Sequence, residues 1–172
     1  LEIIQGLEGA PKEHFYSASM EWGNEKEPEA VVRYCEDYGF DLFADDVIYT
    51  SQGGTVFFVA DNLLGCTPDL ILSQKIVQVK CPDSSTHLKY KLFLNEDNFK
   101  QREEKYFYQM QLEMMLCERP SGDFFSFDPR FKREKMQTHK VEVKADSTVQ
   151  NAIFKKAKLC REQMDKFIKQ LQ

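Results

Sequence analysis

A carboxylate and an ammonium group lie close together near the centre of the chain. Asp69 is followed nine residues later by Gln78, Val79 and Lys80, with a mostly apolar run between them. On a β-strand residues i and i+2 point the same way, so the side chains of Gln78 and Lys80 share a face. Hydrolysis of a phosphodiester needs an activated water and neutralised phosphate charge, which Mg²⁺ held by hard oxygen ligands supplies. Asp69 and the carbonyl of Val79 are such ligands; alternatively, Asp69 caps a turn after Pro68 and Lys80 is a surface lysine.

Short strands and a helix must position this segment. Apolar residues at helical spacing predict a helix from about Met20 to Tyr38, ended by Gly39, with Pro28 marking a boundary or kink near Glu27. Segments with strand-like apolar patterns, separated by turn residues, predict strands at Asp46–Tyr49, Thr55–Ala60, Leu70–Leu72 and Lys75–Lys80.

The second half of the chain predicts a loop, a helix, two strands and a final helix. Lys89–Arg102 is polar and mixed, which is typical of a loop with some helix, and Glu103–Cys117 has a helical apolar face. Strands are expected at Phe124–Phe127 and Thr138–Ala145, and the last helix begins at Asp146 or Ser147. Its apolar stripe consists of Val149, Ala152, Ile153, Ala157, Cys160, Met164, Phe167 and Leu171. This order predicts a single α/β domain over residues 1–172, with a central mixed sheet flanked by helices.

Composition is that of an ordinary soluble globular domain: 172 residues, 30% charged and 42% hydrophobic. No apolar stretch approaches the ~20 residues that cross a bilayer, and no signal peptide is visible, so we expect a cytoplasmic protein without membrane contact. The five cysteines are widely spaced without a CxxC pair, which favours buried thiols over a metal or iron–sulfur site. Surface or turn positions are expected for His14, His87 and His139.

Charge is divided unevenly along the chain. The net charge is −5, yet the segment from Arg130 onward has 12 Lys and Arg against 5 Asp and Glu, or about +7. The remainder has 11 basic and 23 acidic residues. The basic segment is either a solvated helix face or a contact for phosphates.

Five motifs occur in order over about 115 residues. They are Trp22-Gly23-x-x-x-Glu27, Cys66-Thr67-Pro68-Asp69, Val79-Lys80-Cys81-Pro82, Tyr106-x-x-Gln109-x-Gln111 and Phe127-Asp128-Pro129-Arg130-x-Lys132-Arg133-Glu134. This set resembles the lambda-type phage exonucleases, or YqaJ-type viral recombinases, within the PD-(D/E)xK nuclease superfamily. The resemblance implies a restriction-endonuclease-like fold.

The resemblance also implies roles for the matching positions. Asp69 corresponds to the aspartate that bridges the metal ions, position 78 to the second metal-binding carboxylate, and Lys80 to the catalytic lysine that assists the attacking water. Glu27 corresponds to a helix glutamate near the metal, and Gln109 to a helix glutamine that orients the site and substrate.

Three further positions correspond to phosphate contacts. Thr67 stands where the family has a small hydroxyl residue near the terminal phosphate, and Arg130 and Lys132 lie in the last motif. Without the resemblance, Glu27 and Gln109 would be assigned to solvated helix faces, and Thr67 to a turn.

The activity implied is 5′→3′ exonuclease digestion of linear double-stranded DNA by two-metal hydrolysis, with release of mononucleotides and a 3′ overhang for recombination. Mg²⁺ is the expected cofactor, with Mn²⁺ as a substitute. The family forms a ring-shaped trimer around DNA and works with a single-strand annealing protein, in the bacterial host of a phage or prophage. In such a ring the basic C-terminal segment would line the channel.

Two departures from the family pattern stand out. Gln78 replaces the second carboxylate, and a neutral amide oxygen binds Mg²⁺ more weakly, so we expect impaired activity. The exchange favours an engineered substrate-trapping variant over a natural pseudo-nuclease without deciding between them. Before Trp22 the chain has no arginine for a 5′-phosphate, so either that N-terminal segment is missing or phosphate recognition differs.

Two other functions remain open. A non-catalytic DNA-binding pseudo-nuclease would bind DNA and release no nucleotides. Another PD-(D/E)xK enzyme, such as an endonuclease, would cut closed circular DNA, although the chain has little room for a separate specificity domain.

Overall fold

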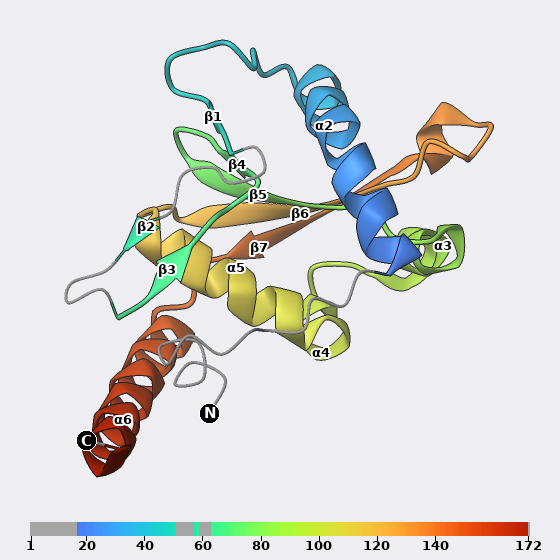
Figure 1. Ribbon diagram of the computed structural model, residues 1–172. Helices are drawn as coiled ribbons and strands as arrows, with labels where there is room; N and C mark the ends of the chain where they lie inside the picture. The colour runs from blue at the N-terminus through green and yellow to red at the C-terminus, as the bar shows by residue number, and fades with distance from the viewer. Residues whose placement is uncertain (1–16, 51–56, 59–62, 172) are drawn as a thin grey trace.

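A five-stranded mixed sheet forms the centre of the protein in the computed structural model, which describes residues 17–50, 57–58 and 63–171. Figure 1 shows the sheet with helices on both sides, as the sequence predicts. The strands β5 and β6 are parallel, and every other neighbouring pair is antiparallel. In spatial order the strands are β1 (Ile48–Tyr49), β4 (Leu70–Ile71), β5 (Lys75–Lys80), β6 (Ser121–Phe127) and β7 (Thr138–Lys144).

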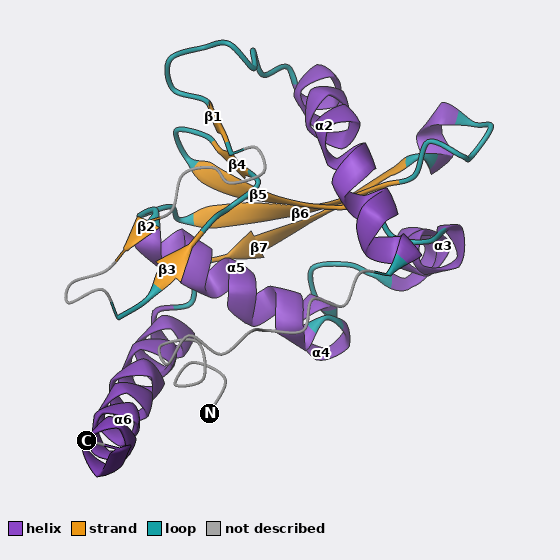
Figure 2. Ribbon diagram, viewed as in Figure 1, coloured by secondary structure: helices purple, strands orange, loops and turns teal. Residues whose placement is uncertain are grey.

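The two faces of the sheet carry separate hydrophobic cores, because side chains alternate along each strand. Ile76 and Phe124 belong to the core under the helix α5 (Glu104–Leu116). Their neighbours Val77 and Phe125 belong to the core under the helix α2 (Ala18–Tyr38). Figure 2 shows the two helices against the strands. Because Gln78 and Lys80 continue the alternation from Ile76, both point toward α5.

The predicted N-terminal helix is confirmed as α2. Ser17 caps its first turn, and Gly39 ends it in the left-handed conformation with φ 72°, which glycine adopts without strain. Of the boundary or kink expected near Glu27, the boundary is wrong, because the helix continues through Pro28. Proline removes one internal hydrogen bond, whereas the buried residues that hold α2 on the sheet all follow it: Ala30, Val31, Tyr34 and Cys35.

The predicted helix at 103–117 is confirmed as α5, and its apolar face is buried as expected. It packs closely on the sheet at Gly122 of β6. A Cβ atom there would lie 2.9 Å from the side chain of Ile76 and 3.0 Å from that of Met110, so these side chains would have to shift to admit a larger residue.

The loop expected at 89–102 is largely helical. The helix α3 (Ser84–Phe93) begins at Asp83, whose side chain accepts from the backbone N–H of Thr86, and α4 (Phe99–Arg102) follows. The helical signal is weak because α3 buries only His87 and Tyr90 on the sheet, while its other positions are polar or exposed.

The last helix, α6 (Ser147–Leu171), begins as predicted, with Asp146 accepting from the N–H groups of Thr148 and Val149. Its apolar stripe is not buried: no residue of α6 is buried, and Phe167 and Leu171 are 48% and 65% exposed. Figure 1 shows the helix extending away from the sheet. The expectation that all cysteines are buried is likewise wrong for Cys160, which is exposed on α6.

Several shorter predictions need adjustment. Of the expected strand Thr55–Ala60, the structure describes only β2 (Phe57–Phe58), which is a strand and pairs with an unpredicted one, β3 (Gly65–Cys66). The rest of that segment and His14 lie outside the described residues. Within the part of the chain that the structure describes, no helix is long and apolar enough to cross a membrane.

Candidate active site

The start of β4 and the end of β5 bring Asp69, Gln78 and Lys80 together. The backbone N–H of Val79 donates to Oδ2 of Asp69 at 2.7 Å, and the side-chain amide of Gln78 donates to the same oxygen. Nζ of Lys80 lies 3.7 Å from this oxygen and donates to the carbonyl of Val79 at 2.8 Å. The side chain of Asp69 therefore faces the edge of β5, where the sequence pattern expects it.

The helix α5 completes the wall of the site above β5. Nε2 of Gln109 donates to Oε1 of Gln78 at 2.8 Å and to Oε1 of Glu113 at 2.9 Å. Nζ of Lys80 lies 5.4 Å from the ring centre of Tyr106, one helical turn earlier. Gln78 is thus held between Asp69 on one side and Gln109 on the other, and it is 1% exposed.

Glu27 approaches the same site from α2. Burial raises the pKa of Glu27, and the charge of Asp69 raises it further, while Lys80 acts in the opposite direction. The role of Glu27 at the metal stays a prediction.

Burial dominates the ionisation of Asp69. It raises the pKa of this carboxyl, although the Lys80 ammonium and the Val79 N–H both oppose the shift. A buried carboxyl with a raised pKa beside an ammonium group is typical of a functional site, and burial is the physical cause of the shift here.

Glu113 is a member of this group that the motif-based analysis missed. It is 2% exposed, and its Oε2 atom has no hydrogen-bond partner among the described residues. Burial raises the pKa of Glu113 to about 7, an effect that the charge of Asp69 increases. A signal for it exists in the sequence, because Glu113 lies four residues after Gln109 and therefore on the same face of a helix.

The oxygen atoms at this site suit a hard divalent cation in part. The Asp69 carboxylate and the Val79 carbonyl are ligands that Mg²⁺ prefers. Gln78 presents its amide nitrogen to Asp69, so its oxygen faces Gln109 instead. Across residues 17–50, 57–58 and 63–171, no three His, Cys, Asp or Glu side chains are close enough to hold one ion. Asp69 and the Val79 carbonyl are therefore the ligand atoms that the described residues bring together here.

The residues expected to contact phosphate differ in their surroundings. Thr67 and Lys132 are exposed. Arg130 is engaged within the protein: it donates to Asp128 at 2.7 and 3.0 Å and to the carbonyl of Pro82 at 2.9 Å. Its guanidinium also lies 4.2 Å from the ring centre of Trp22. Arg130 thereby links the first and last motifs of the chain.

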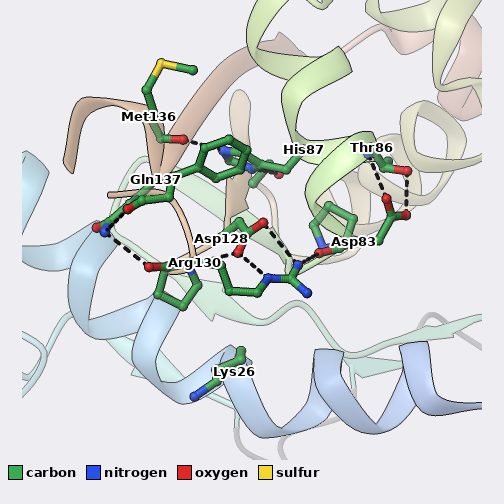
Figure 3. A network of polar contacts seen from close by, with 12 residues as sticks. Lys26, Asp83, Thr86, His87, Asp128, Arg130, Met136 and Gln137 are labelled. Atoms are coloured by element: carbon green, nitrogen blue, oxygen red, sulfur yellow. Dashed lines mark hydrogen bonds and ion pairs between the residues drawn. The ribbon is translucent and has the colours of Figure 1, made fainter. Parts of the chain in front are cut away.

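Figure 3 shows Arg130 beside Asp128, while the Asp83 side chain is turned toward Thr86. The expected surface position of His87 is wrong, because its side chain is fully buried. Its Nε2 atom donates to the carbonyl of Met136 at 2.9 Å, and its Nδ1 atom accepts from the hydroxyl of Ser126 at 2.8 Å. This histidine ties α3 to the sheet and lies apart from the Asp69 group.

One family model matches most of the chain. The sequence model of the YqaJ-like viral recombinase domain matches residues 2–120. The chain is similar to the crystal structure of LHK-Exo in complex with dAMP, at 25% identity and a TM-score of 0.76, over 98% of this chain and 78% of that one. No curated protein matches the chain.

Two further crystal structures share the fold. An alkaline exonuclease, LHK-Exo from Laribacter hongkongensis, has a TM-score of 0.68 at 23% identity, over 99% of this chain and 82% of that one. A phage-related exonuclease from Haemophilus somnus 129PT has a TM-score of 0.74 at 14% identity, over 98% of this chain and 79% of that one.

Proposed function

The chain belongs to the YqaJ-like viral recombinase domain family, and on that premise we propose that it is an exonuclease that digests linear double-stranded DNA from its 5′ ends. Family and fold support a nuclease of the exonuclease type. The observation that carries the proposal is the Asp69 carboxylate held against the edge of β5 beside Lys80. This arrangement matches the order of a metal-binding aspartate and a catalytic lysine in the sequence pattern.

Mg²⁺, or Mn²⁺ in its place, is the proposed cofactor. Asp69 and the carbonyl of Val79 would hold the ion, with Glu27 contributing through its nearby charge. When bound, such ions activate water and neutralise charge on a phosphate. Lys80, a few ångströms from Asp69, would orient the attacking water with its ammonium group. Gln109 fixes the orientation of residue 78 through its hydrogen bond.

Gln78 would weaken metal binding and therefore the proposed nuclease activity. An amide brings no negative charge to the site, and here its nitrogen is turned toward Asp69. This contact favours a second candidate function, a DNA-binding protein of the same fold without catalysis, in which Gln78 satisfies the Asp69 carboxylate without a metal ion.

Phosphate contacts would come from exposed groups around the site. Thr67 and Lys132 are exposed and free to meet a DNA backbone, whereas Arg130 acts on DNA only with the part of its guanidinium that Asp128 leaves open. The side chain of Arg130 remains 42% exposed, which supports a dual role.

A ring-shaped homotrimer around DNA is the proposed assembly, with a single-strand annealing protein as partner, in the cytoplasm of a bacterial host of a phage or prophage. The exposed apolar stripe of α6 supports assembly, because a large apolar face without a covering element is typical of an interaction surface. Basic residues on the same helix would face the phosphates of DNA in the channel.

The proposal is tested with three duplex substrates of one sequence: linear DNA labelled at its 5′ ends, linear DNA labelled at its 3′ ends, and closed circular DNA. An exonuclease of the proposed polarity releases labelled mononucleotide early from the 5′-labelled substrate and leaves the circle intact. Cleavage of the circle would instead identify an endonuclease. DNA binding without nucleotide release at high Mn²⁺ would identify the non-catalytic alternative.

A further inference from the structure

The candidate metal site lacks a negative charge, because Gln78 stands where the family pattern has a carboxylate. We infer that Glu113 of α5 supplies this charge to the cation site from the helix that faces β5. The inference rests on the proposed function, and it concerns a residue outside the motifs on which the resemblance is based.

The position of Glu113 is set by Gln109. One amide nitrogen, Nε2 of Gln109, donates to Oε1 of Gln78 at 2.8 Å and to Oε1 of Glu113 at 2.9 Å. The carboxylate of Glu113 and the amide of Gln78 therefore lie on either side of the same group. The acid lies on the helix rather than on the strand, and hydrogen-bonded side chains connect Asp69 through Gln78 to the helix.

Burial of the ionised Glu113 carboxylate is unfavourable unless a cation neutralises its charge. Glu113 is 2% exposed, and no described residue hydrogen-bonds its Oε2 atom. An ionised carboxylate that is buried with an unsatisfied oxygen is unfavourable in general. The nine salt bridges between described residues do not include Glu113. A divalent cation beside Asp69 would neutralise both carboxylates.

The charges of the site already act on one another. Asp69 repels the ionised form of Glu113, and Lys80 attracts it. The Lys80 ammonium lies 3.7 Å from Asp69 and also favours the ionised forms of Glu27 and Glu113, so one cation acts on three acidic groups. This excess of negative charge is what a Mg²⁺ or Mn²⁺ ion requires from its surroundings.

Glu113 acts on the ion as a positioning residue. The described part of the chain has no three acidic, His or Cys side chains within reach of one ion, so Glu113 is not a third direct ligand in this arrangement. Outer carboxylates and hydrogen-bonding groups that surround the direct ligands typically change metal affinity by about 10- to 100-fold.

The test is a titration of the full chain with Mn²⁺, in which electron paramagnetic resonance measures the unbound ion. Four proteins are compared: the unchanged chain, Glu113→Gln, Gln78→Glu/Glu113→Gln and the control Glu104→Gln, an exposed acid in the first turn of α5. We expect Glu113→Gln to bind Mn²⁺ about 10- to 100-fold more weakly, and the control to bind like the unchanged chain. The double variant returns the carboxylate to β5 and should recover the lost affinity.

The outcomes distinguish the role of Glu113 from the metal-dependent nuclease function on which it rests. Mn²⁺ binding by Glu113→Gln equal to that of the unchanged chain overturns the role of Glu113 and leaves the proposed nuclease standing. The role of Glu113 is also overturned if the double variant binds Mn²⁺ no better than Glu113→Gln. A carboxylate on β5 would then fail to replace the negative charge that Glu113 is proposed to supply. If Glu113→Gln fails to fold, the double variant must still bind Mn²⁺ as tightly as the unchanged chain. Absence of Mn²⁺ binding by all four proteins overturns the metal-dependent function and this inference together.

Discussion

The side-chain amide of Gln78 donates a hydrogen bond to the carboxylate of Asp69, across the neighbouring strands β5 and β4. A glutamate at this position has no proton to donate at neutral pH, and two carboxylates would face each other. Gln78 therefore stabilises the metal-free protein while it removes a charge from the candidate metal site. At position 78, glutamine therefore favours the stability of the metal-free protein, whereas glutamate favours affinity for the metal ion.

The first prediction follows from this opposition. Gln78→Glu should lower the free energy of unfolding without metal by about 1–3 kcal/mol at neutral pH, because a buried hydrogen bond becomes a like-charge contact. Mn²⁺ should restore most of the loss by binding only the folded state. Urea denaturation with EDTA and with Mn²⁺ measures both effects, and Gln163→Glu on the exposed face of α6 is the matched control. Equal stability of Gln78→Glu and the unchanged chain in EDTA would contradict this account of the contact.

The second prediction concerns pH. The pKa of Glu113 is about 7 in the folded protein, against an ordinary value of 4.5. Between these pH values the folded protein holds a proton that the unfolded chain has released, so the free energy of unfolding falls as the pH rises. The difference in pKa corresponds to about 3 kcal/mol in total.

Glu113→Gln removes this proton linkage. In EDTA, its unfolding free energy relative to that of the unchanged chain should rise by about 3 kcal/mol between pH 4.5 and about pH 8. Asp69 and Glu27 are present in both proteins, so the pH-dependent difference reports Glu113 together with its interaction with Asp69. Urea denaturation at a series of pH values measures the difference, and a difference that stays constant with pH would show that Glu113 is not a buried acid of this kind.

The third prediction distinguishes Arg130 from its neighbour Arg133. Arg130→Ala leaves the buried Asp128 carboxylate without its cation and uncovers Trp22, and should lower the free energy of unfolding by about 2–3 kcal/mol. Arg133 is exposed, and Arg133→Ala should change stability by less than about 0.5 kcal/mol. Thermal denaturation of the two variants gives the comparison, and similar stabilities would mean that the Arg130 network contributes little.

The fourth prediction concerns DNA binding. Lys132 is exposed, so Lys132→Ala should weaken DNA binding without affecting stability and lower the slope of log affinity against log salt by about 1. Fluorescence anisotropy with a duplex at several salt concentrations provides the slope, and Lys89→Ala, exposed on α3, serves as control. An unchanged slope for Lys132→Ala would remove this residue from the DNA-binding surface.

The sequence predicts most of the sheet and the grouping of Asp69, Gln78 and Lys80. Strands such as β5 carry a clear signal because their side chains alternate between two separate cores, and the helical apolar face of α5 is buried by the sheet. Local periodicity is sufficient where one face of an element is buried and the other is not.

The failures occur where burial depends on long-range contacts. His87 lies on a polar helix, and it is buried by contacts with residues distant in sequence, among them Ser126, Phe131 and Met136. The stripe of α6 has the periodicity of a buried helix, yet nothing in the described part of this chain covers it. The sequence around Glu113 does not distinguish it from an exposed acid on a helix, because its burial depends on the packing of α5 against β5.

The most direct test of the proposed function measures nucleotide release from linear duplex DNA with 5′-phosphates by the unchanged chain, Gln78→Glu and Gln78→Glu/Asp69→Asn, in Mg²⁺. The account predicts faster release of mononucleotides by Gln78→Glu than by the unchanged chain, because the site regains a carboxylate. Release should be lost in the double variant, which lacks the Asp69 carboxylate. Absence of release by all three proteins, or release that persists without the Asp69 carboxylate, would contradict it.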